Sequence, residues 1–148
     1  AAWLSALKDK MVPILYKGGV VVKWFYPEKN SEKAEHFLLS GEKLIAPEII
    51  RIEVAAALTR LLRMQSLDVA TTTELLRDWR EYLLEETVSL EPTLYDFDAA
   101  TQLSMEFNHQ LQDCLYVAAA SRLGVPLLTA DEKFLKKADE MPCELQPL

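Results

Sequence analysis

The chain has 148 residues, of which 50% are hydrophobic and 26% charged, and its formal net charge is −7. This length allows one domain with one sizeable core. The negative net charge argues against a protein that binds nucleic acid through a broad basic surface. It does not exclude a nuclease whose acidic site recruits divalent cations first. No apolar run approaches the roughly 20 residues that a membrane helix needs, so we expect a cytoplasmic protein.

The first apolar segments are rich in β-branched and aromatic residues, which is typical of buried strands. Residues 14–16 and 20–25 are therefore predicted to be strands. A helix is predicted from Asn30 or Ser31 to about Leu39, with Gly41 closing it, and residues 43–46 are predicted to form a short strand. We interpret residues 1–10 as an N-terminal extension or a cloning remnant ahead of Met11, and residues 11–148 as one domain.

The middle of the chain is predominantly helical. Residues 47–64 predict a helix that is apolar nearly all round, as a buried helix is. Asp68 suits the N-cap of another helix that runs to about residue 86, and a weak strand pattern follows at 87–90. Residues 94–107 again predict a helix.

Two aspartates begin the last predicted helices. Asp113 is placed to open a helix over 114–123, and Asp131 a short helix to residue 138, with a buried strand between them at 125–129. Residues 143–146 could form a last edge strand. Strands that alternate with helices indicate an α/β fold with a largely parallel sheet. Ligands bind such sheets beyond the carboxyl ends of the strands, here after Tyr16 and around Thr129 and Asp131.

Glu53 is the most informative acidic residue, because it projects from an apolar face of the predicted helix 47–64. An ionised carboxylate there costs several kcal/mol unless a metal ion, a basic partner or a raised pKa compensates. The structural alternative is an ion pair with Arg51 or Arg60, or an exposed helix edge. Asp113 and Asp131 have a structural alternative too, since each could be no more than a helix N-cap.

If the fold brings these three acids together, they form a cluster of oxygen ligands of the kind that Mg²⁺ binds. His109 lies four residues before Asp113 and could approach the site, but we interpret it as a loop or helix-end histidine. The charge run DEKFLKK, residues 131–137, is interpreted as a solvated face, although its lysines Lys133, Lys136 and Lys137 could contact a phosphate backbone. Cys114 and Cys143 lack the short spacing of a zinc site and are interpreted as buried thiols in a reducing compartment.

Four segments together resemble a known family. They read VVVKWFYPEKNSEKAEHFL, LIAPEIIRIEVAAALTRLL, DCLYVAAASRLGVPLLTADEKF and the closing strand. The third is the most specific, because an Asp opens an alanine-rich helix that is followed by Gly-x-Pro, a strand and Thr-Ala-Asp. Over residues 11–148 the chain resembles the PIN-domain family, and especially the VapC-type toxin ribonucleases of bacterial and archaeal toxin–antitoxin pairs.

The resemblance implies a three-layer α/β/α sandwich and an endoribonuclease that hydrolyses RNA phosphodiester bonds with Mg²⁺ or Mn²⁺. Glu53, Asp113 and Asp131 match three of the family's catalytic and metal-binding acids, and Thr129 matches a position that supports the site by hydrogen bonding. The resemblance also implies an antitoxin protein as partner and a homodimer or higher homo-oligomer.

The chain departs from the family at the end of the first strand. The family has an aspartate there and a serine, threonine or asparagine two positions later, where this chain has Lys17 and Gly19. Three explanations are open: a degenerate site in which Lys17 pairs with the carboxylates, a surviving nuclease in which Lys17 points away, or an N-terminal sequence disturbed by a cloning or reading-frame error. Outside the family, Lys17 with Gly18 and Gly19 could instead hold an anion in a small-molecule binder, although no P-loop spacing surrounds them.

Overall fold

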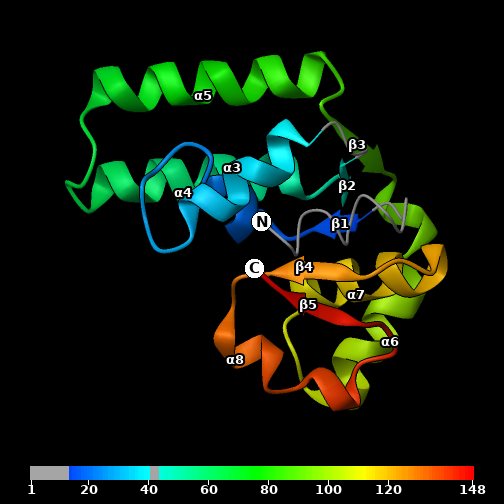
Figure 1. Cartoon of the computed structure of the whole chain (residues 1–148). Helices are drawn as coiled ribbons and strands as arrows, with labels where there is room; N and C mark the ends of the chain where they lie inside the picture. The colour runs from blue at the N-terminus through cyan, green and yellow to red at the C-terminus, as the bar shows by residue number, and fades with distance from the viewer. Residues whose placement is uncertain (1–13, 41–43) are drawn as a thin grey trace.

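The structure is a computed structural model that describes residues 14–40 and 44–148. Within these ranges the strands form one five-stranded sheet in the order β3-β2-β1-β4-β5, and every neighbouring pair is parallel (Figure 1). The chain moves from β1 to β2 and β3 on one side and returns to β4 and β5 on the other. The order therefore reverses between β1 and β4, where α/β sheets place their ligand sites. The bounds are β1 Ile14–Tyr16, β2 Leu44–Pro47, β3 Val88–Glu91, β4 Leu127–Thr129 and β5 Leu145–Pro147.

Helices cover both faces of this sheet. Figure 1 shows α3, α4 and α5 on one side and α6, α7 and α8 on the other, with α5 outermost. The α-helices are α2 Gly18–Val22, α3 Ser31–Leu39, α4 Ile50–Arg63, α5 Val69–Leu84, α6 Phe97–Phe107, α7 Leu111–Leu123 and α8 Glu132–Leu135, and the 3₁₀ helices are η1 Thr93–Tyr95 and η2 Ala138–Glu140.

The alternation of side chains along β1 divides the core into two layers. Ile14 and Tyr16 pack into a cluster that includes buried residues of α4, whereas Leu15 between them packs into a cluster that includes Tyr116 of α7 and Phe134 of α8. A parallel sheet buried on both faces in this way requires a helical layer on each side. The predicted three-layer α/β/α sandwich with a parallel sheet is confirmed.

The prediction of a strand over residues 20–25 is wrong. Residues Gly18–Val22 form α2, and backbone hydrogen bonds from Trp24 to Val21 and from Phe25 to Val22 continue the turns. Val20 and Val21 are fully buried. A short apolar run buried on all sides has no periodicity that separates strand from helix, and here the contact of α2 with α4 decides the conformation.

Several helix boundaries also differ from the prediction. Helix α7 begins at Leu111 with Gln110 as its N-cap, so Asp113 lies in the first turn and is not the cap. The predicted helix from Asp131 to residue 138 ends at Leu135 and gives way to η2. The Asp68 cap is confirmed, because its side chain accepts a 2.6 Å hydrogen bond from the Thr71 backbone N–H.

Other sequence predictions have mixed outcomes. β5 is an edge strand, as predicted. Cys114 is buried but Cys143 only partly so, and burial raises the pKa of both thiols, that of Cys143 to about 11. The extension at residues 1–10, the helix closure at Gly41 and the strand start at 43 lie outside the described residues. Within the described part of the chain, no helix is both long and apolar enough to span a membrane.

Candidate functional site

The carboxyl ends of β1 and β4 bring charged residues from four segments together. Lys17 follows β1 directly, Asp131 follows β4 by two residues, Asp113 lies in the first turn of α7 and Glu53 in the first turn of α4. The Lys17 ammonium nitrogen lies 2.6 Å from Asp113 Oδ1 and 3.9 Å from Asp131 Oδ2. Glu53 packs beside Gly18, since a Cβ placed on that glycine would lie 3.4 Å from the Glu53 Cβ. The three acids singled out in the sequence thus surround one lysine.

Lys17 points into this cluster and not away from it. Its side chain is only 10% exposed, and its ammonium nitrogen lies 4.4 Å from the centre of the Phe134 ring, within the range of a cation–π contact. The backbone of Lys17 is fixed as well, because its N–H donates to the Leu128 carbonyl of β4 and its carbonyl accepts from Val20 in α2. The end of β1, where the resemblance led us to expect an aspartate, therefore holds a buried cation.

Both oxygens of Asp113 have partners. Oδ1 is paired with Lys17, and Oδ2 lies 2.7 Å from the Nε2 atom of His109. The other ring nitrogen of His109 lies 3.0 Å from the ammonium of Lys137. His109 lies in the loop between α6 and α7, as the sequence predicted, but its ring contacts Asp113. Lys137 is only partly exposed and contacts His109, so the interpretation of residues 131–137 as a solvated face is wrong for this residue. The i, i+4 spacing of His109 and Asp113 was the one signal in the sequence.

Asp131 serves as the N-cap of α8. Its Oδ1 accepts hydrogen bonds from the backbone N–H groups of Lys133 and Phe134, at 3.0 and 3.1 Å. The hydroxyl oxygen of Thr129, a fully buried residue, accepts from the Asp131 backbone N–H at 3.1 Å and so fixes the turn between β4 and α8. Asp131 Oδ2, the more distant partner of Lys17, faces the cluster.

Glu53 has a different environment from the two aspartates. Burial raises the pKa of its carboxyl above the ordinary value, while the Tyr116 hydroxyl and the Lys17 ammonium act in the opposite direction. The Tyr116 hydroxyl lies close to this carboxyl, but among the described residues neither it nor Glu53 Oε1 makes a hydrogen bond of standard geometry. Within the same ranges no salt bridge joins Glu53 to Arg51 or Arg60, the partners considered from the sequence.

The residues present do not fit a divalent metal ion in this arrangement. Mg²⁺ and Mn²⁺ need carboxylate oxygens with free lone pairs, but Lys17 and His109 occupy both oxygens of Asp113, and backbone N–H groups occupy one oxygen of Asp131. In residues 14–40 and 44–148, no group of three or more histidine, cysteine or acidic side chains is placed to hold a metal. Gly19 has no side chain and so provides no hydroxyl group at the position where the resemblance led us to expect one. A Cβ atom added to Gly19 would have no heavy atom within 4 Å.

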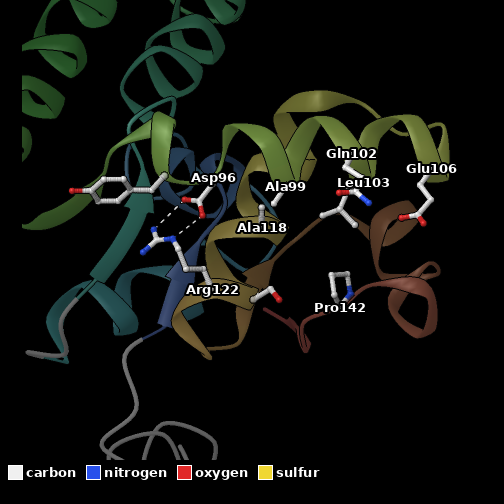
Figure 2. A pocket seen from close by; sticks show the side chains of 10 residues that line it. Asp96, Ala99, Gln102, Leu103, Glu106, Ala118, Arg122 and Pro142 are labelled. Atoms are coloured by element: carbon white, nitrogen blue, oxygen red, sulfur yellow. Dashed lines mark hydrogen bonds and ion pairs between the residues drawn. The ribbon is translucent and has the colours of Figure 1, made fainter.

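A cavity of about 470 Å³ lies elsewhere, between α6 and α7, and contains none of the three acids (Figure 2). At one end of it Arg122 binds the buried Asp96 through two hydrogen bonds, Nε to Oδ1 at 2.7 Å and Nη2 to Oδ2 at 3.0 Å. The Arg122 guanidinium also lies over the ring of Tyr95, 5.3 Å from its centre. No sequence pattern pointed to this pair, because Asp96 precedes α6 and Arg122 lies in α7, 26 residues further along the chain.

Comparison with known proteins assigns the chain to a family. The family model of the PIN domain matches residues 18–140. This chain belongs to the PIN domain family. The ribonuclease VapC1 of Mycobacterium tuberculosis, in strains CDC 1551 / Oshkosh and H37Rv, is 32% identical over 101 residues, which cover 68% of this chain and 71% of VapC1. The PIN domain therefore resembles a VapC ribonuclease over most of both chains.

A solved structure resembles the fold of this PIN domain. It is that of VapBC2 from Rickettsia felis bound to a DNA fragment from their promoter. The TM-score is 0.59 with 13% sequence identity, over 92% of this chain and 98% of the other. At this identity the similarity concerns the fold alone.

Proposed function

We propose that this PIN domain is the VapC-type member of a toxin–antitoxin pair and that RNA is what its acidic site binds. The proposal is supported by the 32% identity with a VapC ribonuclease and by the convergence of Glu53, Asp113 and Asp131 at the reversal of the strand order. Its protein partner would be an antitoxin. A homodimer or higher homo-oligomer and a cytoplasmic location stay predictions.

We further propose that the protein binds RNA or its antitoxin, and that its metal-dependent cleavage of RNA is weak or absent. One observation carries this: the ammonium of Lys17 stands 2.6 Å from Asp113 Oδ1, where an incoming cation would have to bind. Two unit charges about 4 Å apart interact by roughly 4 kcal/mol at an effective dielectric constant near 20, so an ammonium opposes a second cation strongly. Of the three explanations open from the sequence, this geometry favours the degenerate site.

A metal-dependent ribonuclease is the second candidate, and a specific feature of Glu53 favours it. Its Oε1 is buried without a hydrogen-bond partner among the described residues, as a ligand oxygen is before its cation binds. This candidate requires the Lys17 side chain to leave Asp113, since the arrangement with Lys17 in place does not fit Mg²⁺ or Mn²⁺.

The test compares the parent protein with Lys17→Asp, and uses Lys29→Asp as the control. The control makes the same change of charge on the surface, where the Lys29 side chain is 80% exposed. Each protein is melted with and without millimolar Mn²⁺ and is incubated with a labelled single-stranded RNA pool of random sequence. We expect neither a Mn²⁺-dependent rise in Tm nor cleavage for the parent and the control, and both for Lys17→Asp, because a ligand that binds only the folded state stabilises it.

Other results would discriminate between the candidates. A Mn²⁺-dependent rise in Tm together with cleavage by the parent would establish the metal-dependent ribonuclease and remove the degenerate site. If neither the parent nor Lys17→Asp bound the RNA pool in a filter-binding assay without metal, RNA would be excluded as the ligand.

A further inference from the structure

We propose that His109 and Lys137 are positioning residues that orient the carboxylate of Asp113 and thereby decide which of its oxygens faces the centre of the site. The inference concerns the site of the proposed function, but its geometric part holds whether or not the protein cleaves RNA. It adds two residues from outside the acidic cluster, one before α7 and one after α8.

A chain of contacts leads from Lys137 to Lys17. The Lys137 ammonium lies 3.0 Å from His109 Nδ1, His109 Nε2 lies 2.7 Å from Asp113 Oδ2, and Asp113 Oδ1 lies 2.6 Å from the Lys17 ammonium. An ammonium group has only donors, so Nδ1 of His109 must accept the hydrogen bond from Lys137. The ring proton is then on Nε2 and is donated to Asp113. Lys137 thus fixes the direction of both hydrogen bonds in the neutral imidazole.

His109 is held in place by more than these two bonds. Its ring is 13% exposed and packs against Phe134 in a tilted arrangement, with 5.3 Å between the ring centres. Its backbone N–H donates to the Ser104 carbonyl at 3.2 Å, and its carbonyl accepts from the Ser104 hydroxyl at 2.6 Å. The ring therefore has little freedom to turn away from Asp113.

The segment 131–137 connects these contacts with the rest of the site. It begins with Asp131, which faces Lys17, and its Phe134 lies under both the Lys17 ammonium and the His109 ring. It ends with Lys137, which binds His109. Carboxylates that bind ions in proteins are commonly held by hydrogen bonds from outer residues, and loss of the outer partner weakens the inner contact. Here the inner contact is the pair of Asp113 with Lys17.

The experiment uses the full chain and nuclear magnetic resonance of the two imidazole rings and the lysine ammonium groups. We expect His109 in the parent to be the Nε2–H tautomer with a slowly exchanging ring proton, and His36 serves as the reference ring. Lys137→Met should speed the exchange of that proton by about tenfold, as the loss of one hydrogen bond implies, and should shift the Lys17 ammonium signal. Lys136→Met is the matched control, since Lys136 is exposed on the same segment, and it should change neither signal.

A conservative variant separates positioning from packing. Lys137→Arg keeps a cationic donor and should preserve the tautomer and the Lys17 signal, whereas a role in packing alone would leave Lys137→Met indistinguishable from Lys136→Met. The proposal is overturned if His109 is the Nδ1–H tautomer or if Lys137→Met leaves both signals unchanged. Should Lys137→Met fail to fold, Lys137→Ala also removes the donor, and the same two signals decide. A failure to bind RNA would not alter these results and would count against the proposed function alone.

Discussion

Lys17 lies with its ammonium 4.4 Å from the centre of the Phe134 ring, which closes one side of the acidic cluster. On the other side the ammonium binds Asp113, and both side chains are largely buried. An ion pair between two largely buried groups beside an aromatic ring contributes to folding, because separation of the pair leaves each charge poorly solvated. The consequences can be measured.

Replacing Lys17 with methionine should destabilise the protein by about 2 kcal/mol at neutral pH. The substitution keeps the apolar stem but leaves the Asp113 carboxylate, 15% exposed, without its cation. Removal of one partner from a buried pair costs up to about 3–5 kcal/mol, and the hydrogen bond to His109 moderates the loss here. Urea unfolding followed by circular dichroism measures it.

Lys29→Met is the control for this prediction, because the Lys29–Glu132 pair is 80% and 81% exposed and such pairs contribute less than about 1 kcal/mol. Equal stability of Lys17→Met and the parent would show that the pair does not contribute to folding.

The two glycines that follow Lys17 should respond in opposite ways to added side chains. Gly19 is exposed in α2, and a Cβ added there would meet no heavy atom within 4 Å, so Gly19→Ala should stabilise the protein by about 0.5–1 kcal/mol through lower backbone entropy. At Gly18 a Cβ would lie 3.4 Å from the Glu53 Cβ and 3.5 Å from the Tyr116 hydroxyl. Gly18→Val should therefore lower the Tm, since its γ-methyl groups have no room; a tolerated valine would mean that α2 can move away from α4.

The substitution Glu53→Gln should stabilise the folded protein increasingly as the pH rises from 4 to 7. Burial raises the pKa of the Glu53 carboxyl in the folded state. Because the folded state binds the Glu53 proton more tightly than the unfolded state, this proton stabilises the parent protein fully at pH values below the pKa of the unfolded state. That stabilisation is lost as the pH rises through the pKa of the folded state. Glutamine does not titrate, so the variant does not lose stability in this way. Unfolding free energies of the variant and the parent at several pH values test the sign.

Glu35→Gln on the exposed face of α3 controls for the loss of one acidic group. A difference between Glu53→Gln and the parent that is the same at all pH values, or that shrinks as the pH rises, would contradict the raised pKa.

Asp96→Asn should cost about 2 kcal/mol, although the residue is remote from the acidic cluster. Asp96 is 3% exposed and binds Arg122 through both oxygens, a bond that raises the pKa of the guanidinium. The amide can reproduce only one of the two hydrogen bonds, and the charge attraction is lost. Thermal unfolding of Asp96→Asn beside Asp98→Asn, an exposed neighbour in α6, measures the difference.

Much of the architecture was available from the sequence. The long helices α4 and α5 and the strand–helix alternation are set by periodicity, by the Asp68 cap and by prolines and glycines, which act locally. Glu53 was recognised as a carboxyl group among apolar neighbours, Asp131 as an acid directly after a buried strand, and Asp113 as the first residue of a predicted helix. Such signals depend on a few adjacent residues, so they can be recognised in the sequence without a three-dimensional structure.

The tertiary structure alone decided how these residues are used. Val20 and Val21 are helical because α2 packs against α4. The sequence allowed Lys17 to point outward, but in the structure its side chain is enclosed by residues of α7 and α8. His109 and Lys137 joined the site because α7 and α8 meet there. Ion pairs between residues far apart in the sequence depend on how the helices and strands pack. A short segment of sequence does not specify the distance between such residues. The sequence therefore determined the family, the layers and the acids, and only the folded chain determined that a lysine stands at their centre.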